Sequence, residues 1–312
     1  MESFLLIKTK SKLMKKILIS GATGLVGKKL TRKLYERGYK VEILVRSRSK
    51  KTDFKSYIWD YENGFLEEGA LDNTYIFIHL AGASISKRWT KDYKKEIYKS
   101  RIDSAQFIYE KMLEKDIHPE AVISSSAVGF YGQITSEHIF SEEDSPAEDF
   151  LGSICTDWEL KALLFENLGS RVVRIRTSTV LSEKGGALEA LKKPIELNVG
   201  APLGSGKQYF PWIHIDDLVN IYFKAVEDVS MNGAYNASAP DFVTNEILTK
   251  KIAYHLNKKI FLPNIPKFII KTVLGEMSVL ALEGSRTSSA KIENAGFKFV
   301  YDNLDKALAD VI

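Results

Sequence analysis

Short apolar runs alternate with segments of helical period along the first half of the chain. Residues 16–20 read as a buried strand, and Val26, Leu30 and Leu34 then recur at helical spacing until Gly38. Further strands are expected at 41–45, 57–59, 75–80, 121–125 and 171–177, and helices at about 90–113 and 150–167. Near-continuous apolar strands separated by helices are typical of a parallel sheet covered on both faces. The pattern therefore predicts an α/β fold with a doubly wound parallel sheet, the Rossmann arrangement.

The pattern becomes less regular beyond Gly185 and predicts a second, smaller C-terminal lobe. A helix begins near Ala187, a loop rich in Gly and Pro covers residues 200–211, and a further helix follows at 216–226. A short strand at 233–236 is expected to return to the sheet.

These elements divide the chain into two expected domains. Residues 14–185 form the sheet domain, with 214–239 packing back onto it, and residues 186–213 and 240–312 form the C-terminal lobe. Met14 is the expected start of the native chain, because the first strand begins directly after it.

Composition, net charge and cysteine content exclude several classes of protein. The 312 residues are 45% hydrophobic and 27% charged, as in a globular protein with a sizeable core. The net charge of +4 does not indicate a nucleic-acid partner. The single cysteine, Cys155, excludes an internal disulfide and fits the cytoplasm. The strongly apolar stretch around 75–85 contains His79 and is too short to span a membrane, so no membrane partner is expected.

A glycine-rich loop directly after the first strand predicts a dinucleotide site. Its glycines, Gly21, Gly24 and Gly27, permit a tight turn, close approach of a pyrophosphate and close packing of the next helix. A merely structural turn is the alternative. The residues expected to hold the cofactor here are Gly21, Thr23, Gly24, Leu25, Val26 and Gly27.

The end of the second strand favours NADP over NAD. NAD sites usually place an acidic residue there, whereas this chain has Arg46 and Ser47, which suit a 2′-phosphate. Glu42 lies in the middle of the strand and is a poor substitute. Asp60, after the third strand, is either an acceptor for the adenine amino group or an exposed turn residue.

With these pieces placed, the chain resembles the extended short-chain dehydrogenases, the NAD(P)-dependent epimerase/dehydratase family. More closely, it resembles the atypical subgroup of bacterial YfcH-type and human SDR39U epimerase family proteins with their C-terminal domain. The motifs that carry the resemblance lie at 21–27, 79–90, 124–132, 204–217 and 275–280.

The resemblance implies hydride transfer at a nicotinamide, assisted by a serine and a Tyr-x-x-x-Lys pair. It places Leu80, Ala81 and Gly82 beside the cofactor. Ser126, at the carboxyl edge of the sheet, either holds the reacting oxygen of the substrate or only caps the following turn. The window in which the pair is expected, 149–159, contains neither tyrosine nor lysine. Tyr131 is the nearest phenol and becomes the candidate acid, with core packing as the alternative.

Several other side chains allow both a functional and a structural interpretation. Arg101 falls on an apolar helix face, where it binds either a phosphate or acidic substrate, or an acidic side chain from Glu96, Asp103 or Asp157. Lys87 and Arg88 form either a basic rim or an ordinary exposed loop.

Three further features favour structure over chemistry. Cys155 suits inert packing, His214 and Asp216 resemble the family's structural turn, and the pattern Tyr254-x-x-x-Lys258 lies outside the expected window. The histidines show no metal-ligand spacing, so no metal site is expected.

The sequence therefore predicts an NADP(H)-binding, epimerase-like oxidoreductase that acts on a small polar substrate, either neutral or anionic. Ser126 and Tyr131 are its candidate catalytic residues. Because the tyrosine and lysine pair is missing, a non-catalytic module that senses NADP(H) and signals to a partner protein is the alternative.

Overall fold

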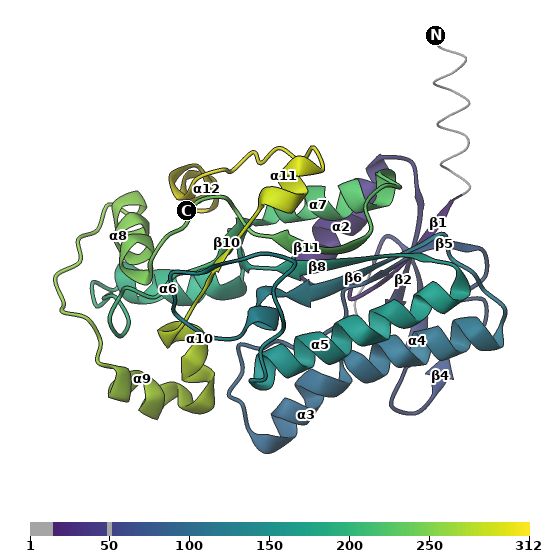
Figure 1. Ribbon diagram of the computed structural model, residues 1–312, viewed down its shortest axis with the longest axis horizontal. Coiled ribbons are helices and arrows are strands. Elements are labelled where there is room, and N and C mark those ends of the chain that lie inside the picture. Colours follow the sequence, from purple (N-terminus) through teal and green to yellow (C-terminus); the bar gives the residue numbers. More distant parts are fainter. Residues whose placement is uncertain (1–14, 49–51) are drawn as a thin grey trace, which may run out of the picture.

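The structure is a computed structural model that describes residues 15–48 and 52–312. The expected start at Met14 lies outside the described residues. A large sheet runs through the middle of the molecule, with its strands in the order β11-β8-β6-β5-β1-β2-β3-β4 (Figure 1). The strands are β1 (Lys16–Ser20), β2 (Lys40–Val45), β3 (Lys55–Asp60), β4 (Phe65–Leu66), β5 (Thr74–His79), β6 (Ala121–Ala127), β8 (Arg171–Thr177) and β11 (Gly233–Ala237). Among the strands of residues 15–48 and 52–312, only β4 pairs antiparallel within this sheet, so the predicted doubly wound parallel fold is confirmed.

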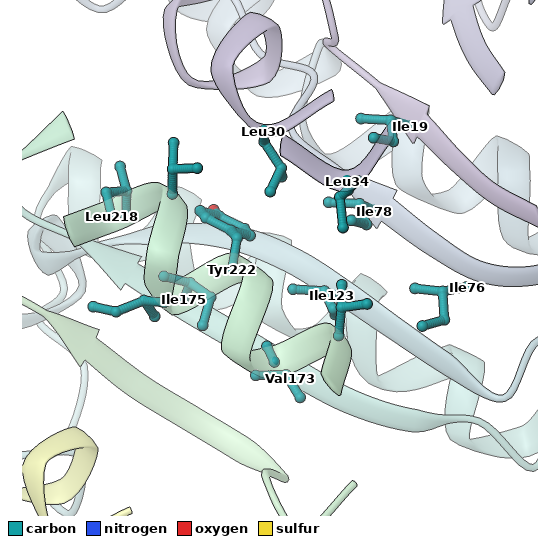
Figure 2. Packing of buried hydrophobic residues seen from close by; sticks show 14 of the residues in the cluster. Ile19, Leu30, Leu34, Ile76, Ile78, Ile123, Val173, Ile175, Leu218 and Tyr222 are labelled. Atoms are coloured by element: carbon teal, nitrogen blue, oxygen red, sulfur yellow. The ribbon is translucent and has the colours of Figure 1, made fainter. Parts of the chain in front are cut away.

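Helices cover both faces of the sheet, as the apolar strands require. On one face lie α2 (Leu25–Glu36) and α7 (Ile215–Glu227), and on the other lie α4 (Ile102–Glu114) and α5 (Phe150–Leu163) (Figure 1). Figure 2 shows Leu30 and Leu34 of α2 and Tyr222 of α7 above the strands that carry Ile78 and Ile123. Full burial of such a side chain contributes roughly 1.5–3 kcal/mol, so this layer accounts for much of the stability.

The single helix expected over residues 90–113 is in fact two helices. Helix α3 (Lys91–Lys99) ends at Ser100, and α4 begins after Arg101. The Ser100 hydroxyl accepts a hydrogen bond from the Ala83 N–H at 2.8 Å and donates to the Ile97 carbonyl at 3.1 Å. The helix is therefore interrupted at the residue that binds the loop containing Ala83, although apolar residues recur at helical spacing before and after this point.

The remaining elements form the smaller C-terminal lobe and its junction with the sheet. They comprise η1 (Val128–Tyr131), β7 (Ile139–Phe140), β9 (Thr179–Leu181), α6 (Gly186–Glu196), β10 (Trp212–His214), α8 (Asn245–His255), α9 (Lys267–Leu274), η3 (Gly275–Ser278), α10 (Val279–Leu282), β12 (Arg286–Thr287), α11 (Ala290–Asn294) and α12 (Leu304–Val311). The short helix η2 (Leu164–Leu168) instead continues α5 and packs in the core of the sheet. Parallel pairs β10–β9 and β12–β7 join chain segments that are far apart in sequence. Helix α7 packs on the sheet and β11 forms its edge strand beside β8, in the part of the chain, 214–239, that the sequence assigns to the sheet domain. Within the described ranges, no helix has both the length and the apolar content of a membrane span.

Candidate functional site

The carboxyl ends of four neighbouring strands meet at one edge of the sheet. Ser20 of β1 pairs with Leu44 of β2 and with His79 of β5, and His79 pairs with Ser124 of β6. Strand order reverses at β1, because β2 and β5 lie on its opposite sides. Ligands of open α/β sheets bind in the crevice at such a switch point.

The loop between β1 and α2 needs glycine for steric reasons that the structure makes explicit. Gly21 has a φ of +71°, and a Cβ there would lie 2.5 Å from the Leu80 carbonyl carbon. A Cβ on Gly27 would lie 2.4 Å from the Gly21 carbonyl oxygen, which also accepts the Gly24 N–H at 3.0 Å. Gly24 is the N-cap of α2 and presents no side chain over the helix terminus. The first amides of α2 are thus open to an anion.

A cavity of about 360 Å³ opens in front of this loop. It is lined by Gly21, Thr23, Gly24, Leu44, Val45, Arg46, Ser47, Trp59, Tyr61, Leu80, Ala81, Gly82, Ala83, Glu96 and Ser100. Eight of these residues are among the thirteen that the sequence assigns to the cofactor. The cavity and the glycine cradle therefore fit the adenosine and pyrophosphate part of a dinucleotide.

The other five residues assigned to the cofactor do not line this cavity. Leu25 is 36% exposed, Val26 packs against the core, and Gly27 lies behind the turn. The Asp60 carboxylate accepts hydrogen bonds from the backbone N–H groups of Glu62 and Asn63 and from the Asn63 side chain, which lowers its pKa. It thus stabilises its own turn, and its contact with adenine stays a prediction.

The cavity also contains residues that sequence reasoning missed. Trp59 and Tyr61 come from the end of β3, and Glu96 and Ser100 come from α3 and its C-terminus. Trp59 and Tyr61 could have been found from the sequence, because β3 ends at the same edge of the sheet as β2. No local signal indicates Glu96 or Ser100, because the approach of α3 to the cavity is a tertiary contact.

Two neighbouring arginines at the end of β2 have different surroundings. Arg48 donates to the carboxylate of Glu67 and to the Ser56 carbonyl. Arg46 lines the cavity and is exposed, and among the described residues no carboxylate lies within ion-pair distance of it. Glu42 is buried between Lys16 and Lys40, at 2.8 and 3.0 Å, and so cannot reach a ribose.

Arg101, the fifth residue outside the lining, lies directly behind the cavity wall. Its guanidinium carbon would be 3.0 Å from a Cβ on Gly82, and it donates to the carbonyls of Ala83 at 2.9 Å and Ile97 at 3.0 Å. It also lies over the ring of Trp158, 5.2 Å from the centroid. The described part of the chain offers this guanidinium no acidic partner, so its charge is balanced only by carbonyl dipoles and an aromatic face.

Ser126 and Tyr131 belong to one buried hydrogen-bond network. The Ser126 hydroxyl donates to the Glu159 carboxylate at 2.7 Å, and Arg176 donates to both oxygens of that carboxylate at 2.8 and 3.0 Å. Arg176 also donates to the Tyr131 hydroxyl at 3.0 Å, which itself donates to Asn236 at 2.7 Å. The guanidinium is thus a cation beside the phenol, yet burial outweighs it and raises the pKa of Tyr131 to about 12. The phenol is therefore protonated at neutral pH, and the catalytic roles of both residues stay predictions.

The positions that favour structure over chemistry behave accordingly. Cys155 is buried, and burial raises the pKa of its thiol to about 12, so it is a poor nucleophile. Tyr254 is 76% exposed near the end of α8, outside the cavity lining. Lys87 and Arg88, for which both interpretations are open, are exposed, and Lys87 lies over the ring of Tyr93, 5.3 Å from its centroid, so the basic rim stays a prediction.

His214 joins α7 to the C-terminal helix α12. Its Nδ1 accepts the backbone N–H of Asp216 at 3.1 Å, which assigns the ring proton to Nε2, and Nε2 donates to Asp310 at 3.1 Å. These three side chains come close enough to share a metal ion. However, both ring nitrogens are already used, and Asp216 pairs with Lys29 at 2.6 Å. The contacts describe a scaffold that holds the two lobes together.

His79, at the end of β5, makes the stability of the fold depend on pH. Burial lowers its pKa from 6.5 to about 4, and its Nδ1 lies 2.8 Å from the Ser20 hydroxyl. The unfolded chain therefore binds the extra proton first, so stability is lost as the pH falls from about 6.5 toward about 4. We expect a loss of about 3 kcal/mol over this interval, measured by urea unfolding at several pH values. A His79→Gln variant should show a smaller loss over the same interval; an equal slope would contradict the assignment.

Sequence comparison identifies the class of protein that this fold and site define. Residues 17–238 match the NAD dependent epimerase/dehydratase family, and residues 265–311 match a domain of unknown function, DUF1731. The chain belongs to the NAD dependent epimerase/dehydratase family.

Individual relatives narrow the class to the subgroup that the motifs indicate. An epimerase family protein of Staphylococcus haemolyticus is 35% identical over 304 residues, which cover 96% of this chain and 99% of the relative. The crystal structure of human epimerase family protein SDR39U1 with NADPH has a TM-score of 0.84 at 28% identity and covers 95% of this chain and 98% of its own. A nucleoside-diphosphate sugar epimerase from Corynebacterium glutamicum has a TM-score of 0.77 at 31% identity, covering 98% of this chain and 62% of its own. The predicted resemblance to SDR39U-like proteins is confirmed.

Proposed function

We propose that the protein is an NADP(H)-dependent, epimerase-like oxidoreductase. The observation that carries the cofactor preference is the exposed Arg46 guanidinium in the cavity, together with the burial of Glu42 away from it. A 2′-phosphate would meet a cation at this position, and a 2′-hydroxyl would find no carboxylate from β2. The NADPH bound to the similar human protein supports the same preference.

Different residues of this chain would bind different groups of the cofactor. The amides of the loop from Gly21 to Gly24 and the start of α2 would bind the pyrophosphate, and Arg46 with Ser47 the 2′-phosphate. Trp59 and Tyr61 offer aromatic surface to the adenine. Behind the wall, Arg101 would add positive potential next to Gly82, which favours an anionic ligand over a neutral one.

The bound nicotinamide would accept or donate a hydride, and the protein must exclude water and orient a polar substrate. Lys87 and Arg88 lie on the loop before α3, and Arg88 lies within 4 Å of where a Cβ on Gly275 of η3 would be, so the two lobes meet there. This basic rim supports a small polar substrate with an anionic group. Turnover of Ser126→Ala and Tyr131→Phe tests the two candidate catalytic residues.

The cofactor preference can be tested with two neighbouring arginines. Arg46→Ala should weaken NADPH binding about 10- to 100-fold, because a charge-assisted hydrogen bond contributes roughly 1.5–3 kcal/mol. Its NADH affinity should change by less than about threefold. Arg48→Ala is the matched control, because Arg48 is already bound to Glu67 and Ser56. Isothermal titration calorimetry measures all three proteins; equal losses for both cofactors would contradict the proposal.

Catalysis itself requires a separate measurement. Purified protein with bound NADPH should show a change in nicotinamide absorbance with a carbonyl compound or sugar from a panel that includes anionic members. Persistent redox silence with tight binding would instead favour the regulatory alternative, which family membership does not support.

A further inference from the structure

The segment from Leu256 to Gly275, which leads from α8 through α9, combines exposed apolar side chains with an all-positive charge. It contains four lysines and neither Asp nor Glu, and one of these lysines, Lys267, pairs with Glu283 of the neighbouring chain segment at 3.7 Å. Phe261, Phe268 and Val273 are 75%, 69% and 65% exposed, and two further aliphatic side chains are also exposed. We call the following nine residues the basic-apolar surface: Lys258, Lys259, Phe261, Leu262, Lys267, Phe268, Ile269, Lys271 and Val273. The segment forms the outer margin of the C-terminal lobe (Figure 1).

Helix α9 carries both buried and exposed apolar side chains. Ile270 is buried and Leu274 half-buried, and this stripe faces the protein. Phe268, Ile269 and Val273 lie on the rest of the helix and face solvent. Apart from Lys267, Lys271 and Thr272, every residue of α9 is apolar, and contiguous exposed apolar patches often mark interaction sites. Exposure of Phe268 and Val273 therefore indicates that another body covers this face.

The positive charge of the basic-apolar surface decides which kind of partner can cover it. In a two-fold symmetric dimer the same patch meets itself, so Lys258, Lys259 and Lys271, which have no ion pair within the described residues, would oppose their own copies. Closure onto α3 would also bring like charges together, because α3 contains four lysines and only two acidic residues. The occupant must be negatively charged and must also accept Phe and Val side chains.

A bilayer surface that contains anionic lipids meets both requirements. Lipid phosphates attract lysines by about 1 kcal/mol each near the surface, and the acyl boundary accepts apolar side chains of an interfacial helix. We propose that the basic-apolar surface docks the protein peripherally on anionic membranes. This is surface attachment and not a span, and none of the nine residues lines the dinucleotide cavity.

Co-sedimentation with lipid vesicles tests the docking. The full-length protein should sediment with vesicles of equal parts phosphatidylglycerol and phosphatidylcholine but not with pure phosphatidylcholine, and high salt should reduce the binding. Phe268→Ser with Val273→Ser should lower the partition coefficient about tenfold or more. Lys259→Glu with Lys271→Glu should lower it by at least about tenfold.

Matched controls keep the test specific. Leu197→Ser and Lys298→Glu change an equally exposed apolar residue and an exposed lysine elsewhere, and should bind vesicles like the wild type. Circular dichroism and NADPH titration of every variant confirm that the fold is retained. A wild type that stays in the supernatant with anionic vesicles would overturn the proposal. So would full binding by the Phe268 and Val273 variant, or a dimer that this variant dissociates in the absence of vesicle binding.

Discussion

A Gly27→Ala variant is expected to lose at least about 100-fold in NADP(H) affinity and roughly 2–3 kcal/mol in unfolding free energy. The added Cβ would lie 2.4 Å from the Gly21 carbonyl oxygen and 2.7 Å from the Ala22 Cα. Both atoms belong to the backbone, so neither can rotate away. Helix α2 must therefore move away from the loop, which separates its N-terminal amides from the pyrophosphate. Calorimetric titration measures the affinity, and urea unfolding measures the stability.

Gly38→Ala is the control for this prediction. Gly38 has a φ of +85°, and nothing lies within 4 Å of a Cβ at this position. The substitution should therefore cost only the strain of a left-handed alanine, about 1–2 kcal/mol, and should leave cofactor affinity unchanged. If both variants lost cofactor affinity, the loss would be due to lower stability alone. If both retained it, the close contact at Gly27 would have no role in cofactor binding.

Local patterns in the sequence account for the sheet and the cofactor loop. Strand β1 has an apolar centre, Ile17 to Ile19, and is followed at once by the glycines, so strand, turn and helix can be placed without any tertiary information. The basic residues at the end of β2 could also be assigned to the cavity, because the carboxyl ends of adjacent parallel strands share one edge of the sheet.

Contacts between distant segments are what the sequence could not predict. The break at Ser100 results from a hydrogen bond to Ala83, a partner seventeen residues away. Glu96 lines the cavity because α3 lies beside it, and no residue near Glu96 in the sequence indicates this. Arg101 could be assigned a partner only in general terms: the sequence offered carboxylates or a ligand, whereas the structure offers two backbone carbonyls.

The contacts of the candidate catalytic residues with Glu159 are a further example of what the sequence could not predict. Sequence spacing locates Ser126 at the end of a strand but cannot show that its hydroxyl is bound to a buried carboxylate. Nor can it show that Arg176 on β8 lies beside Tyr131 on η1, since the two strands β6 and β8 are brought together only by the sheet.

This network leads to the second large expected effect. Arg176→Met should lower the unfolding free energy by about 3–5 kcal/mol, because it leaves the buried Glu159 carboxylate without its bidentate partner. Arg174 still contacts one oxygen at 3.1 Å but is more exposed and does not replace the lost bonds. Urea unfolding at neutral pH provides the measurement.

A double variant shows how much of the lost unfolding free energy comes from leaving the buried Glu159 carboxylate without a partner. Glu159→Leu combined with Arg176→Met removes both buried charges and should be more stable than Arg176→Met alone, since an uncompensated carboxylate costs more than an absent one. NADPH affinity of the folded variants should stay within about threefold of the wild type, because neither residue lines the dinucleotide cavity. If Arg176→Met instead retained full stability but abolished both cofactor binding and turnover, the network would belong to the reaction and not to the scaffold.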